Sequence, residues 1–64
     1  MKQTTLNKLK EKYIKSIVTV FDLTHNLAYD ISDLPEEDTD IKIEKINSVN
    51  IIGRDLYNIY ITFV

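Results

Sequence analysis

At 64 residues the chain is long enough for one small domain, and a chain of this length buries only about 60% of the surface that its unfolded form exposes. It contains no cysteine, which excludes disulfides and thiolate metal sites, and its formal net charge is −2 at pH 7. Such a small core is usually supplemented by oligomerisation or by a partner. We therefore expect a single domain over residues 1–64 that associates with another chain.

Hydropathy predicts a soluble, cytoplasmic protein without membrane contact. The apolar runs are far shorter than the roughly 20 residues that span a bilayer, and the N-terminal lysines are not followed by the apolar segment of a signal peptide. Isoleucine, lysine, asparagine and tyrosine are abundant, as in AT-rich coding sequences. That bias, in so short a chain, suits a gene of a phage or another mobile element.

The N-terminal half has the apolar pattern of a helix. At 100° per residue, most of its apolar side chains between Leu6 and Ile31 fall within about half of the helix circumference, and Val18 and Tyr29 fall outside it. Thr4 or Thr5 is a suitable N-cap, and Pro35 ends the helix because proline cannot continue the hydrogen-bond ladder. We predict a long amphipathic helix over about residues 5–32.

An alternative concerns residues 17–31. The run "SIVTVF" is rich in β-branched residues, which favour strands, and "THN" could turn the chain between two such strands. The run does not alternate cleanly between apolar and polar positions, so the helix is the favoured interpretation.

Residues 33–40 are predicted to form an acidic connector, and residues 41–64 a β region. From residue 41 onward the apolar side chains share odd positions, the period of a strand, and "INSVN" and "GRD" interrupt the pattern. Gly53, the only glycine, marks the tighter turn. The predicted fold class is α+β, with the long helix followed by a small antiparallel hairpin or three-stranded meander that packs on it.

A second architecture is a helical hairpin that dimerises into a four-helix bundle. Asn47, Ser48, Asn50, Gly53 and Asn58 argue against it, because they are poor residues for the interior of a helix.

No pattern predicts catalysis, a metal site or a cofactor. The chain has neither a GxSxG elbow nor a glycine-rich phosphate loop. Asp22 and His25 have the carboxylate-x-x-His spacing of di-iron bundles, but they lack further ligands and are expected to form an exposed pair. Asp38 and Asp40 do not continue into a calcium loop, because Lys42 and Ile43 occupy the positions of an oxygen ligand and a glycine.

Charge is distributed unevenly along the chain. Residues 1–15 carry five lysines against one glutamate, or +4, whereas residues 16–41 carry seven carboxylates and no lysine or arginine, or −7. The acidic run predicts an electronegative surface that docks on a basic patch of a larger protein, with a tyrosine beside it as an anchor. The predicted protein-binding residues are Tyr29, Asp30, Asp33, Glu36, Glu37, Asp38 and Asp40.

The order of charges also predicts self-association. Lysines early and carboxylates late in a helix oppose its macrodipole, and antiparallel pairing of two helices would reverse that effect. Apolar residues at seven-residue spacing would form the seam of such a homodimer. They are Leu6, Tyr13, Val20 and Leu27.

Together these features predict a small non-enzymatic interaction module, of the inhibitor or adaptor type, whose partner is a larger host protein with a basic surface. The alternative is a small dimeric nucleic-acid-binding regulator that uses the N-terminal lysines. We do not favour nucleic acid as the partner, because the whole chain is acidic and no arginine accompanies the N-terminal lysines to read bases.

Overall fold

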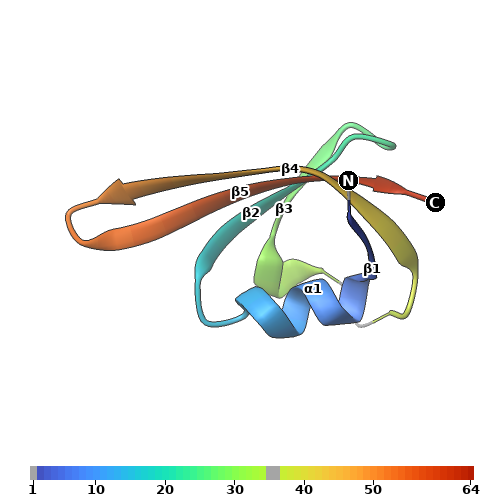
Figure 1. Cartoon of the computed structure of the whole chain (residues 1–64), viewed down its shortest axis with the longest axis horizontal. Helices are drawn as coiled ribbons and strands as arrows, with labels where there is room; N and C mark the ends of the chain where they lie inside the picture. Colours follow the sequence, from blue (N-terminus) through green and yellow to red (C-terminus); the bar gives the residue numbers. More distant parts are fainter. Residues whose placement is uncertain (1, 35–36) are drawn as a thin grey trace.

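The computed structural model describes residues 2–34 and 37–64, which form one mixed sheet with a short helix on one face (Figure 1). No helix among these residues is long and apolar enough to cross a membrane. The elements, in chain order, are β1 (Lys2–Thr5), α1 (Leu6–Tyr13), β2 (Ile17–Asp22), β3 (Leu27–Asp30), the 3-10 turn η1 (Ile31–Asp33), β4 (Asp40–Ile51) and β5 (Arg54–Phe63).

The five strands lie in the order β1-β4-β5-β2-β3. β2 and β5 are parallel, and every other neighbouring pair is antiparallel. It follows that β1 runs in the same direction as β2, although β4 and β5 lie between them. The connection from β1 to β2 must therefore cross the sheet, and α1 is that crossing segment, which is why it covers one face (Figure 1).

The predicted fold class is wrong. The helix ends at Tyr13 instead of continuing to about residue 32. The described strands form one five-stranded sheet, so the fold is neither a long helix with a small C-terminal sheet nor a helical bundle. The alternative in which residues 17–31 form a strand pair agrees with β2 and β3, and residues 24–26 lie in the turn between them. Val18 and Val20 of β2 are buried under α1, whereas Ile17 and Phe21 point to the other face. Apolar side chains on both faces of one strand produced the false helical pattern.

Within its eight residues α1 has ordinary local signals. Thr5 is the N-cap, and its hydroxyl accepts a hydrogen bond from the Lys8 backbone N–H at 3.3 Å. Leu6 and Leu9 are buried against the sheet, and Lys10 and Lys12 lie in the last turn. Lysines near the C-terminus of a helix interact favourably with its dipole. The unfavourable charge order that was predicted for the long helix therefore does not arise in α1.

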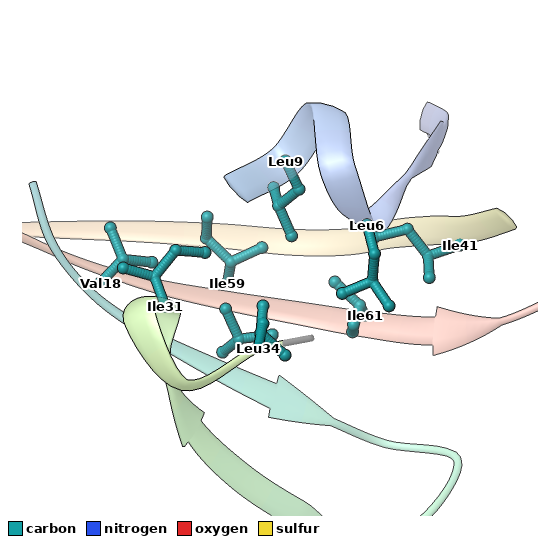
Figure 2. Close-up of a cluster of buried hydrophobic side chains, with 9 residues drawn as sticks. Leu6, Leu9, Val18, Ile31, Leu34, Ile41, Ile59 and Ile61 are labelled. Atoms are coloured by element: carbon teal, nitrogen blue, oxygen red, sulfur yellow. The ribbon is translucent and has the colours of Figure 1, made fainter. Parts of the chain in front are cut away.

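The core lies between α1 and the sheet. Leu6 and Leu9 point down from the helix, and side chains of the segment that follows β3 close the side of the cluster (Figure 2). Tyr13 and Tyr57 add a tilted ring contact with centroids 5.5 Å apart. The buried apolar residues are Leu6, Leu9, Val18, Val20, Ile31, Leu34, Ile41, Ile59 and Ile61.

β4 and β5 form a hairpin that extends well past α1 (Figure 1). Its turn consists of Ile52 and Gly53, whose φ angles of 50° and 76° are those of a type I′ turn. The molecule measures 35 × 20 × 19 Å, with this hairpin along the longest axis. The predicted tight turn at Gly53 is thus present, but "INSVN" lies inside one continuous strand and makes no turn.

A bulge between Ile43 and Lys45 changes which residues of β4 face the core. Ile41 and Ile43 pair with Phe63 and Ile61 on the helix side. Beyond the bulge, Ile46 takes the helix side. Val49 and Ile51, which the shared odd parity had assigned to the same face as Ile41, therefore point away from the helix.

Candidate functional site

No helix of the described residues lies on the sheet face opposite α1, and we call this face the open face (Figure 1). The register of the strands orders its side chains in rows across the sheet. An aromatic row contains Lys45, Tyr60, Phe21 and Ala28, a polar row contains Asn47, Asn58, Thr19 and Asp30, and an apolar row contains Val49, Leu56 and Ile17.

The aromatic row is centred on one ring pair. Phe21 of β2 and Tyr60 of β5 are stacked with centroids 4.8 Å apart and planes 13° from parallel. Ala28 of β3 lies beside Phe21, so no large side chain covers that edge of the ring. Both rings remain partly accessible to solvent. A flat pair of this kind offers apolar area with few rotatable bonds, which is what a binding surface requires.

The apolar row lies at the start of the projecting part of the hairpin. Ile17 and Val49 are 50% and 49% exposed, with the half-buried Leu56 between them. Ile51 continues the row toward the turn and is also half exposed. The bulge in β4 causes this grouping, because without it Val49 and Ile51 would point to the helix side. The apolar row could not be predicted from the sequence, since no turn-forming residue marks the bulge.

Most of the predicted acidic surface lies in the segment between β3 and β4. Asp30, Asp33, Glu37, Asp38 and Asp40 are all exposed. Asp22 and His25 form a carboxylate–basic contact elsewhere, in the turn between β2 and β3. Glu36 and Pro35 lie outside the described residues, and the remaining predicted anchor, Tyr29, is half-buried and packs against the core.

Part of the acidic run has a role inside the fold. The Leu6 and Asn7 backbone N–H groups donate to the carbonyls of Thr39 and Glu37 at 3.0 and 3.1 Å. The Asp38 carboxylate accepts a hydrogen bond from the Asn7 side chain at 3.0 Å. These contacts place negative charge at the N-terminus of α1, whose own first turn has no acidic residue.

Asp30 also acts locally: its carboxylate accepts hydrogen bonds from the Ser32 backbone N–H and hydroxyl, each at 3.2 Å, and so caps η1. Its side chain lies at the end of the polar row of the open face. This position links the acidic run to the open face.

Asp22 and His25 form a pair, as expected, in which His25 is exposed and Asp22 is buried. Asp22 is 3% exposed, and its carboxylate accepts from the His25 backbone N–H at 3.1 Å and contacts the His25 Nδ1 at 2.7 Å. The His25 ring meets Phe63 edge-on with centroids 5.3 Å apart. The pair holds the turn between β2 and β3, and no group of three or more metal-ligating side chains exists among the described residues.

The predicted self-association seam does not exist as a helical stripe. Leu6 is on α1 and Val20 on β2, and both are buried within the chain's own core. Tyr13 packs against that core, and Leu27 is half exposed on β3. These residues belong to three different elements, because the long helix that would have aligned them is absent.

The N-terminal lysines are divided among different surroundings. Lys10 Nζ donates to the Leu34 carbonyl at 2.8 Å, and Lys12 lies 5.5 Å from the centre of the Tyr13 ring. Lys8 and Lys12 line one groove and Lys15 lines another. Their use in nucleic-acid binding stays a prediction.

Known proteins give no relative for this arrangement: no family model matches the chain, and neither a curated protein sequence nor a solved structure matches it.

Proposed function

We propose that the chain is a small non-enzymatic protein-interaction module, of the inhibitor or adaptor type, that binds a larger protein through the open face. The observation that carries the proposal is the half-exposed apolar row of Ile17, Leu56 and Val49 on the same face as the stacked Phe21 and Tyr60. Grouped apolar side chains on a surface mark interaction sites, and aromatic residues are enriched at the centres of interfaces.

Charge indicates the chemistry of the partner. The chain has net charge −2, and the exposed carboxylate of Asp30, part of the acidic run, lies on the open face at the end of the polar row. A complementary surface is apolar where it meets the two rows and basic where it meets the acidic run. Such complementarity acts mainly on the association rate and on specificity, whereas the buried apolar rows set the lifetime of the complex.

The proposal is tested by placing a photo-crosslinking amino acid at Tyr60, on the open face, or at Glu11, an exposed residue of α1 on the opposite side of the sheet. In an extract of the host, we expect position 60 to crosslink a protein that position 11 does not. Crosslinks from position 11 alone, or equal yields from both, would contradict binding through the open face.

The crosslinked protein is then purified and its affinity measured. Phe21→Ala combined with Leu56→Ala should raise the dissociation constant by shortening the lifetime of the complex, and the control Lys12→Ala should not. Replacing Glu37, Asp38 and Asp40 by amides should slow association at low salt with little effect at high salt, because salt screens exposed charges. An unchanged affinity in the open-face variant, with its circular dichroism unchanged, would reject the proposal.

A further inference from the structure

The outer edge of β4 has a long segment without a strand partner. β1 pairs with β4 only from Asp40 to Ile43, and β5 occupies the inner edge of β4 throughout. From Lys45 to Ile51, therefore, none of the described strands meets the outer edge, which is visible as the upper rim of the projecting hairpin in Figure 1. Unpaired strand edges present backbone donors and acceptors to other chains.

The two-residue turn determines which groups this edge presents. In such a hairpin the residues that flank the turn, here Ile51 and Arg54, bond to each other, and bonded pairs then alternate along the ladder. Val49 and Asn47 thus direct their backbone groups toward β5. Ile46, Ser48 and Asn50 direct theirs outward.

Proteins usually protect a free edge with lysine, proline, a bulge or a very short strand. The other outer strands here, β1 and β3, are protected in the last way, with four residues each. The free part of β4 has none of these devices between residues 46 and 52, a segment without any charged residue, and its bulge precedes it. An edge of this kind is suited to pairing with a strand.

We propose that the strand is β4 of a second copy, paired antiparallel across a twofold axis at Val49. In this register Val49 lies opposite Val49 of the second copy, Ser48 opposite Asn50, and Asn47 opposite Ile51. The central pair is apolar and the pair of Ser48 with Asn50 is polar, because positions 48 and 50 are equidistant from 49, as are positions 47 and 51. With no charge between Lys45 and Arg54, the two copies do not repel each other at the contact.

Ile52 provides an independent reason for this register. It is 98% exposed at the tip of the hairpin, and its φ of 50° is unfavourable for a β-branched residue, so the isolated chain gains nothing from it. A groove of about 150 Å³ between α1 and β4 is lined by Leu9, Tyr13, Ile43 and Ile46, with Lys8 and Lys12 at its sides. The pairing brings Ile52 of the second copy to Ile46, at the end of this groove.

The dimer goes beyond the proposed function. A twofold axis perpendicular to the sheet places both open faces on the same side, so that the two apolar rows join across the axis. Each copy contributes the one long free edge of its described strands, which closes the assembly at two chains.

Analytical ultracentrifugation from micromolar to millimolar concentration tests the proposal. The wild type should be a dimer at the upper end. Ser48→Pro removes the outward backbone N–H of residue 48 and leaves the hydrogen bonds between β4 and β5 in place. It should weaken dimerisation about tenfold or more, because two hydrogen bonds between the copies are lost per dimer. Ser48→Ala is the matched control and should dimerise normally. A wild type that stays monomeric, an assembly larger than two, or a dimer indifferent to Ser48→Pro would overturn the inference.

A cysteine variant tests the axis without depending on proline. The chain has no native cysteine, and side chains of a facing non-hydrogen-bonded pair lie close enough for a disulfide. Val49→Cys should oxidise rapidly to a covalent dimer. Ile17→Cys, at a position of nearly equal exposure on the open face but away from the edge, should not. Equal rates in the two variants would contradict the register.

Discussion

The two ends of the β4–β5 hairpin contain similar residues in very different surroundings. At the end near α1, Ile41, Ile59 and Ile61 are buried, because the helix lies over them and neighbouring strands flank them on both sides. At the other end Val49 and Ile51 are half exposed, because β1 does not reach so far and the bulge has turned them from the helix side. Isoleucine and valine stabilise the fold at one end and remain available for contacts at the other.

The largest expected effect comes from placing a charge at each end. Ile59→Asp buries an unpaired carboxylate, which costs several kcal/mol, about as much as the total stability of a small domain, and should abolish cooperative unfolding. Val49→Asp leaves its carboxylate in water and should keep a cooperative transition. Urea unfolding followed by circular dichroism, at low protein concentration, measures both. If the two variants behaved alike, the contrast between the ends would be wrong.

A smaller effect is expected at the turn of the exposed end. Ile52→Asn should stabilise the chain by about 1 kcal/mol, because asparagine accepts a positive φ at a type I′ turn and isoleucine does not. The melting temperature should rise by roughly 4–8 °C. Gly53→Ala is the matched opposite: its new methyl group meets no atom within 4 Å, so any loss of stability comes from the φ of 76° alone. A fall in melting temperature for Ile52→Asn would contradict this account.

The smallest expected effect concerns the acidic run, which lies near the end of the hairpin that α1 covers. Asp38→Asn keeps an acceptor for the Asn7 side chain and removes only the charge near the N-terminus of α1. We expect a loss of about 0.3–1 kcal/mol at low ionic strength that fades as salt is added. Asp33→Asn, also exposed but located in η1, serves as the control and should show less dependence on salt. Thermal unfolding at two salt concentrations compares the two variants. Equal salt dependence would contradict a stabilising interaction between the Asp38 charge and the N-terminus of α1.

The sequence predicted those elements in which a local signal and the tertiary surroundings agree. Thr5 caps α1, the odd positions of β5 from Tyr57 to Phe63 face the core, and Gly53 turns the hairpin. Ile59 and Ile61 could be assigned to the core because β5 has apolar residues at alternate positions and ends without a bulge.

The remaining elements could not be predicted because tertiary contacts override the local pattern. β2 is an inner strand, paired on both sides, and its apolar residues serve both the core and the open face, which at short range resembles the stripe of a helix. The apolar row of the open face depends on the bulge near Glu44, and no glycine or proline in the sequence there indicates a bulge. The acidic run was recognised from composition, but its contacts with α1 require the fold.

The position of β5 has a consequence for how the chain folds during synthesis. β5 follows the other four strands of the sheet in the chain, yet it lies in the middle of the sheet, where it pairs with both β4 and β2. Its parallel partner is distant in sequence: Ile17 aligns with Leu56, and Asp22 with Ile61. During synthesis β2 and β3 therefore lack this parallel partner until β5 has been made, and a parallel pair of such high sequence separation closes slowly. The domain should acquire protease resistance in one late step rather than progressively as its N-terminal half appears.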